Sequence, residues 1–203
     1  MLNFKAAIVL SLAITVIVTS CGNNTQTEHQ DAALKTQTDT AVIQPIIPNQ
    51  DSLLQPGVAA GKIKIDQDSE EVFKVLGRPD SSDAAMQKMV AFWFINQDGI
   101  KYSTAIYAAR DTENPPISRV RQIRVTSPSF KTELGLGVTS TLAEIKKAYK
   151  VHEIIYPLAP EQELHVWSDG IGMGFEVGED QRCNAVLIYK KGDEPGSTYL
   201  PLR

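Results

Sequence analysis

Apolar positions recur at two different spacings after residue 60, and each spacing predicts a different kind of element. Val72, Val75 and Leu76 are three or four residues apart, the spacing that puts side chains on one face of a helix. Ile145, Ala148 and Tyr149 repeat the same pattern further along the chain. Two short amphipathic helices are therefore predicted, each burying one apolar stripe.

Polar residues at the start of both stretches support these two helices. Asp68-x-x-Glu71 and Thr141-x-x-Glu144 match the capping box, in which a short acceptor and a glutamate three residues later satisfy free backbone N–H groups. Gly77 is expected to end the first helix, and Pro79 cannot continue it.

Dense or alternating apolar runs predict strands after each helix. Turn signals separate them, namely Gln97-Asp98-Gly99 in the first half and Ser168-Asp169-Gly170 in the second. The predicted strands are residues 89–95, 100–108 and 117–126, then 164–167, 171–177 and 183–190.

The order of these elements suggests an internal repeat. Residues 62–77 align with residues 135–150 at a constant offset, pairing Ile65 with Val138 and Val72 with Ile145. The expected fold is α+β, with two tandem units at residues 58–130 and 131–203. Each unit is a strand, a helix and a three-stranded meander, and together they form an antiparallel sheet with helices on one face.

The motif residues carry a resemblance to known lipoproteins. The pattern Asp68-x-x-Glu71-Val72-x-x-x-Leu76-Gly77-x-Pro79 resembles the helix signature of the BamE-like (SmpA/OmlA) family of small outer-membrane lipoproteins. The stretch Gly137-Val138-x-x-Thr141-x-x-Glu144-Ile145 resembles a second copy, which lacks the Leu-Gly-x-Pro ending. Doubled units of this kind are similar to the beta-lactamase inhibitor protein family, and that resemblance implies one continuous antiparallel sheet.

The N-terminal residues form a targeting signal. Residues 1–20 contain Lys5 and then a short apolar run, residues 6–18, which is typical of a secretory signal peptide and too short to cross a bilayer. The segment Val18-Thr19-Ser20-Cys21-Gly22 resembles a bacterial lipobox, which implies acylation of Cys21. Two or more acyl chains hold a protein stably on a membrane. An ordinary signal peptide with a chance cysteine is the alternative.

Residues 21–57 are predicted to be the lipidated cysteine and a flexible tether. They are rich in Gln, Thr, Asn and Asp and contain no aromatic residue, so they offer little to bury. The predicted location is the cell envelope, bound to membrane lipid through Cys21. No aspartate follows Cys21, which favours the outer membrane facing the periplasm if the organism has one.

Composition and charge limit the possible functions. The 24 acidic and 20 basic residues give a formal net charge of −4, and no long basic run is present, so nucleic-acid binding is not supported. The 2 cysteines exclude a disulfide scaffold. His29, His152 and His165 lack metal-ligand spacing, so no metal or other cofactor is expected.

Few residues suggest chemistry. Cys183 is either a nucleophile or a small apolar residue of a strand, and we favour the strand. Trp93 and Trp167 lie on corresponding predicted hairpins and form either an exposed binding patch or part of the core. The arginines Arg119, Arg121 and Arg124 belong either to a solvated face or to a contact with an acidic partner or lipid headgroups.

These observations favour a non-enzymatic function. The sequence predicts a membrane-anchored, exported lipoprotein that acts as a protein-binding module and has an envelope protein as its partner. Inhibition of a secreted hydrolase, or binding of a small ligand, is the alternative. An enzyme that uses Cys183 or a pair of carboxylates is the least favoured hypothesis.

Overall fold

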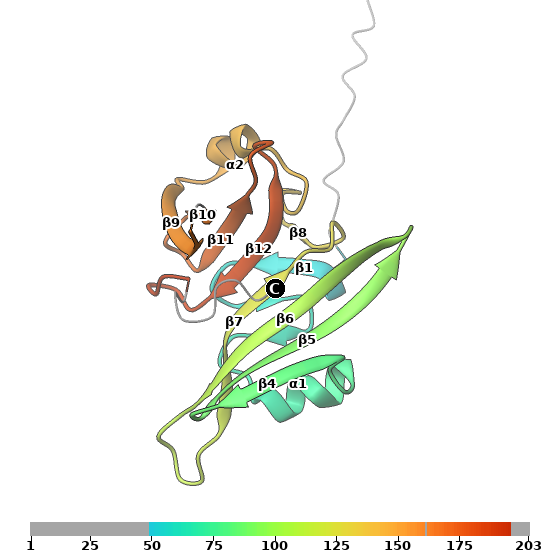
Figure 1. Ribbon diagram of the computed structural model, residues 1–203, viewed down its shortest axis with the longest axis vertical. Helices are drawn as coiled ribbons and strands as arrows, with labels where there is room; N and C mark the ends of the chain where they lie inside the picture. The colour runs from blue at the N-terminus through green and yellow to red at the C-terminus, as the bar shows by residue number, and fades with distance from the viewer. Residues whose placement is uncertain (1–48, 161, 196–203) are drawn as a thin grey trace, which may run out of the picture. The chain divides into compact units, whose positions relative to one another are not determined.

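The computed structural model describes residues 49–160 and 162–195, and this part of the chain is mostly β-structure (Figure 1). The predicted signal peptide, residues 1–20, lies outside the described residues. So do the predicted lipidation site Cys21, most of the predicted tether and the last residues of the predicted second unit.

A large antiparallel sheet contains eight strands in the order β4-β5-β6-β7-β12-β11-β10-β9. Its central pair is β7 and β12, in which Ile123 lies opposite Ile188. Every neighbouring pair is antiparallel. The strands are β4 (Ser81–Ala85), β5 (Lys88–Gln97), β6 (Ile100–Arg110), β7 (Ser118–Val125), β9 (His152–Ala159), β10 (Gln162–Ser168), β11 (Met173–Val177) and β12 (Cys183–Tyr189).

A second, small sheet has the strand order β3-β2-β1-β8. It consists of β1 (Leu53–Gln55), β2 (Ala59–Ala60), β3 (Ile63–Lys64) and β8 (Lys131–Thr132), and β1 pairs with β8 in parallel. A short 3-10 helix, η1 (Gln50–Ser52), precedes it. Of these elements, η1 and β1 lie within the predicted tether, residues 21–57. The folded part therefore begins before the predicted boundary, because Leu53 and Leu54 are buried.

Two short helices are present among the described residues, α1 (Ser69–Leu76) and α2 (Leu142–Ala148). Thr141 and Glu144 form the predicted capping box on α2. In α1, Asp68 accepts from the N–H of Glu70, whereas Glu71 pairs with Lys74. Neither described helix has the length and hydropathy that crossing a membrane requires.

One core joins the helices to both sheets. It contains Val72 of α1, Ile145 of α2, Leu54 of the small sheet, and Ile123 and Phe175 of the large sheet. A second apolar cluster consists of Leu164, Val166, Leu187 and Tyr189. Alternation along the strands, together with the pairing of Phe175 with Val186, places this second cluster on the opposite face of the large sheet from Phe175.

The predicted α+β class, with two tandem units and helices on one face, is wrong. The described chain is mostly β, with two sheets and only two short helices. The strands of the small sheet have two or three residues, too few to show alternation. β4 was missed because its side chains are polar or small and all of them are exposed.

Candidate functional site

Strands β5 and β6 extend beyond both of their neighbours. β4 pairs with β5 only as far as Phe92, and β7 pairs with β6 only from Thr104 onward. Residues 94–103 are therefore a two-stranded hairpin, called the arm below, that projects from the large sheet (Figure 1). An isolated two-stranded hairpin is at best marginally stable in water, so the arm depends on its own turn and on its base.

The turn at the tip of the arm is well defined by its sequence. Gln97 pairs with Ile100, which leaves the two-residue loop Asp98-Gly99. Asp98 has φ 51° and Gly99 has φ 77°, both in the left-handed region. Asp-Gly is a preferred pair for such a turn, because its twist matches the twist of the strands. The sequence prediction of a turn at Gln97-Asp98-Gly99 is confirmed.

Hydrogen bonds hold the base of the arm to the rest of the chain. The N–H of Ser103 donates to Oγ1 of Thr126 at 2.7 Å, and the N–H of Thr126 donates to the carbonyl of Ser103 at 3.0 Å. On the other strand, the N–H of Phe94 donates to Oδ2 of Asp80 at 2.7 Å. The arm therefore has a fixed direction at its base.

Both faces of the arm carry apolar side chains. Ile95 lies opposite Tyr102 on one face, and the side chains of Ile95 and Ile100 are 53% and 54% exposed. On the other face, the rings of Phe92 and Phe94 stack with centroids 6.2 Å apart. Lys101 Nζ lies 3.7 Å from the centroid of Phe94. The arm thus presents apolar area that the described part of the chain leaves in contact with solvent.

A groove of about 630 Å³ lies where the arm meets the main body of the fold. Ile100, Tyr102 and Thr126 line it from the side of the arm, and Val138 and Arg182 line it from the other side. The exposed apolar face of the arm is therefore continuous with a concave surface.

The structure does not bring the two predicted tryptophans together as an exposed patch. Trp93 is 9% exposed and belongs to the core, where its indole N–H donates to the carbonyl of Gly77 at 3.0 Å. Trp167 is half-buried on β10, and four strands of the large sheet lie between β10 and β5. Lys146 Nζ lies 3.8 Å from the centroid of the Trp167 ring.

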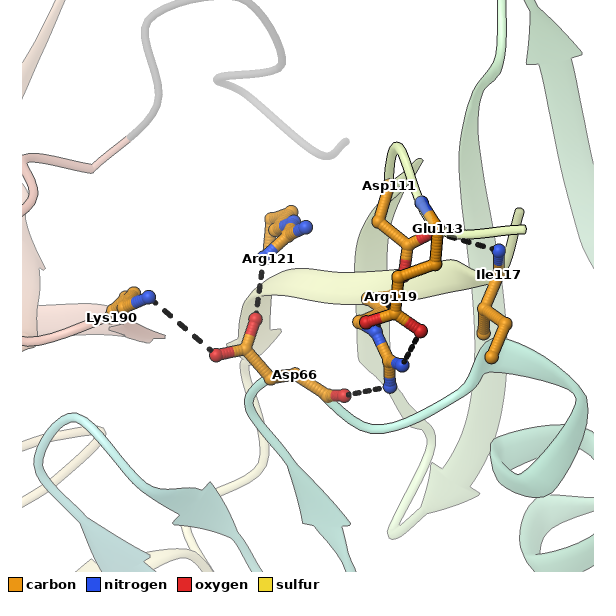
Figure 2. Close-up of polar contacts among 7 residues, drawn as sticks. All are labelled: Asp66, Asp111, Glu113, Ile117, Arg119, Arg121 and Lys190. Carbon is orange, nitrogen blue, oxygen red and sulfur yellow. Dashed lines mark hydrogen bonds and ion pairs between the residues drawn. The ribbon is translucent and has the colours of Figure 1, made fainter. Parts of the chain in front are cut away.

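Arg119 is neutralised by acidic groups of its own chain. Its Nε donates to Oδ2 of Asp111 at 2.7 Å, and its Nη2 donates to Oε2 of Glu113 at 3.0 Å (Figure 2). The N–H of Ile117 also donates to Asp111, and this bond is the main reason that the pKa of Asp111 is lowered, with Arg119 adding to the effect. Arg119 thus ties the loop between β6 and β7 to β7.

Arg121 and Arg124 also have acidic partners. Figure 2 shows Arg121 bound to the carboxylate of Asp66, whose other oxygen lies 3.9 Å from Lys190 Nζ. Arg124 is buried and forms a two-pronged pair with Glu176, at 2.8 Å and 2.7 Å. The three arginines of the predicted basic cluster are therefore bound to carboxylates of this chain.

Cys183, the candidate nucleophile of the sequence, is not set up for reaction. Cys183 is buried, its S–H donates to the carbonyl of Ala185, and burial raises its pKa to about 12, so a thiolate is disfavoured. Among residues 49–160 and 162–195, no group of three or more His, Cys, Asp or Glu side chains could hold a metal ion.

The arm was missed at the level of sequence. The run from Met89 to Ile95 is apolar at consecutive positions, so both faces of the strand are apolar. This pattern indicates a strand but does not show which of its faces the rest of the chain covers. The predicted strands, residues 89–95, 100–108 and 117–126, gave no sign of an overhang, because the overhang depends on how far each neighbouring strand pairs.

Comparisons with known proteins do not identify a family for this chain. No family model matches the chain, and no curated protein matches it significantly. A solved structure of an extracellular protein containing an SCP domain from Bacillus anthracis str. Ames matches at 16% identity and a TM-score of 0.40. The match covers 67% of this chain and 45% of that one, so this chain spans less than half of its length.

Proposed function

We propose that this chain is an exported lipoprotein that acts as a non-catalytic protein-binding module in the cell envelope, with the arm as its contact surface. The observation that carries the proposal is the exposure of Ile95 and Ile100 on a hairpin that no neighbouring strand of the described residues covers. Solvent-exposed apolar side chains that gather on one element are typical of interaction sites.

The chemistry of the arm suits a protein partner. Ile95, Ile100 and Tyr102 offer apolar area on one face, and the stacked rings of Phe92 and Phe94 offer aromatic area on the other. Aromatic residues are enriched in the buried centres of protein interfaces. The strand edges of the arm also have backbone N–H and C=O groups available for pairing with an added strand.

The sequence supports attachment to a membrane. The lipobox-like segment that ends at Cys21 and the polar residues that follow it favour a protein held on lipid through acylated Cys21. The proposed partner is therefore an envelope protein within reach of the same membrane, which is the outer membrane if the organism has one.

A paired substitution in the arm tests this proposal. Ile95→Asp combined with Ile100→Asp places two charges in the contact surface and leaves the core unchanged, because both side chains are already about half exposed. We expect partner capture from the native envelope to fall at least about tenfold, with an unchanged melting temperature.

Leu134→Asp is the matched control, since Leu134 is 62% exposed and lies outside the arm. Capture by this variant should equal that of the unmodified protein. Equal capture by the arm variant and the control would show that the arm is not the contact surface.

A further inference from the structure

A second concave site lies at the buried pair of Arg124 and Glu176, and Asn184 lines both this site and the groove at the base of the arm. It is a cavity of about 680 Å³ between the start of β10, the turn that joins β11 to β12, and β7. Leu164, Pro157 and Val177 supply apolar walls. The volume is ample for a long side chain or a small organic molecule.

The ion pair in this cavity is unusual because it is buried. The side chains of Arg124 and Glu176 are 9% and 3% exposed, and both carboxylate oxygens of Glu176 accept from the guanidinium. The free energy lost when two charges leave water can exceed the attraction between them, so apolar side chains in their place are often at least as stabilising. A buried ion pair is therefore weak evidence for stability. Its position in the wall of a cavity suggests a role in binding.

The charges around the cavity favour a cation. Glu163 and Glu179 are exposed at its rim and join Glu176, whereas Arg124 is the one permanently charged cation in the lining. His165 also lines it, with its Nδ1 2.7 Å from Glu153 and its Nε2 3.8 Å from Glu163. Because Arg124 offsets Glu176, the two rim carboxylates leave the cavity with an excess of negative charge.

The hydrogen-bonding groups of the cavity also favour a cationic ligand. A carboxylate has about four acceptor positions, and the two bonds from Arg124 occupy only part of those on Glu176. Gln162 and Asn184 add side-chain amide oxygens to the lining. A group with several N–H donors and a positive charge would bind to these acceptors, whereas an anion would be repelled by the rim.

We propose that this cavity binds an ammonium or guanidinium group, with the alkyl part of the ligand against Leu164 and Pro157. Such a group belongs either to a lysine or arginine side chain of a bound protein or to a free small diamine. The inference does not depend on the arm, which lies on different strands.

Titration calorimetry of the full chain with agmatine, which carries both an ammonium and a guanidinium group, tests the proposal. A blocked arginine tripeptide is the second probe. We expect saturable binding that weakens with added salt, and a loss of about two- to fivefold for each of Glu163→Gln and Glu179→Gln. Both variants should fold, because these side chains are exposed.

Asp83→Gln is the control, since Asp83 is exposed on β4 and does not line the cavity. Binding of both probes would identify a protein side chain as the ligand, and binding of agmatine alone would identify a small diamine. Absence of saturable binding by either probe, or affinities that the two rim substitutions leave unchanged, would overturn the proposal. The arm variant Ile95→Asp/Ile100→Asp should still bind agmatine, so failure here is distinguishable from failure of the arm as a contact surface.

Discussion

At the scale of single residues, each arginine of the predicted basic cluster is paired with a carboxylate of the same chain. Arg119, Arg121 and Arg124 each bind an acidic side chain that is distant in sequence or lies in a loop. Asp66 occupies a left-handed conformation, with φ 62°, and its carbonyl and carboxylate contact Arg119 and Arg121 respectively. Arg119 and Arg121 are therefore neutralised within the chain, where they hold the loop residues Asp111 and Asp66.

The loop between β6 and β7 should respond to acid through Asp111. The pKa of Asp111 is lowered from 3.8 because its ionised form accepts from the N–H of Ile117 and from Arg119. Its contribution to the free energy of unfolding is therefore present above the unfolded pKa and is lost as the pH falls through the lower, folded value.

We predict that Asp111→Asn lowers the denaturant midpoint at pH 7 and that the difference from the unmodified protein shrinks in strongly acidic solution. Denaturation followed by circular dichroism across a pH series measures both effects. Asp83→Asn, at an exposed position on β4, should leave the denaturant midpoint unchanged at both neutral and acidic pH. A difference for Asp111→Asn that stays constant from neutral to acidic pH would contradict this account of the loop.

At the scale of elements, the start of α2 follows the sequence closely. Thr141 Oγ1 accepts from the N–H of Glu144 at 3.3 Å, and the N–H of Thr141 donates to Oε2 of Glu144 at 2.8 Å. Both bonds satisfy backbone donors that an isolated helix would leave free. The capping box of α2 is thus a local device that the sequence predicts correctly.

Loss of this cap has a predictable cost. Thr141→Ala should lower the free energy of unfolding by about 1 kcal/mol, because the hydroxyl acceptor is removed, as measured by chemical denaturation. Thr141→Ser keeps the hydroxyl and should cost much less. Equal losses for the two variants would assign the effect to the methyl group of threonine rather than to the cap.

The strands show which parts of the fold the sequence could predict. Strands with clear apolar runs, such as those containing Phe92 and Ile188, were predicted near their observed positions. β1, β2, β3 and β8 are too short for periodicity, and β4 has no buried residue, so no apolar pattern marks them. The class was wrong because these unmarked strands add a second sheet.

The candidate site was less predictable than the elements. Trp93 was a candidate because it and Trp167 lie on corresponding predicted hairpins, with a core position as the alternative. Contact with Phe73 and the hydrogen bond to the carbonyl of Gly77 make Trp93 a core residue. Ile95 and Ile100 were missed because exposure depends on which strands lie beside them. That depends on sheet order, which apolar pattern does not encode.

At the scale of the whole molecule, the large sheet includes one hairpin, residues 94–103, that extends beyond its neighbouring strands. The centre of the large sheet is buried through Ile123, Val186 and Ile188. β6 pairs with β7 beside this centre, so the part of the β5–β6 hairpin below the arm is held in the sheet. In residues 94–103 the same two strands pair with each other and have no further neighbouring strand among the described residues. The fold thus holds an apolar hairpin in a defined position, as the proposed contact with a partner requires.

Site-specific photocrosslinking in the native envelope tests this claim most directly. A photoreactive amino acid placed at Ile100 should capture one protein in stoichiometric yield, and Ile95→Asp in the same chain should abolish that product. The same amino acid at Leu134 should not capture it. Equal products from both positions, or no protein product at Ile100 in an envelope that contains the lipidated chain, would contradict a protein-binding function for the arm.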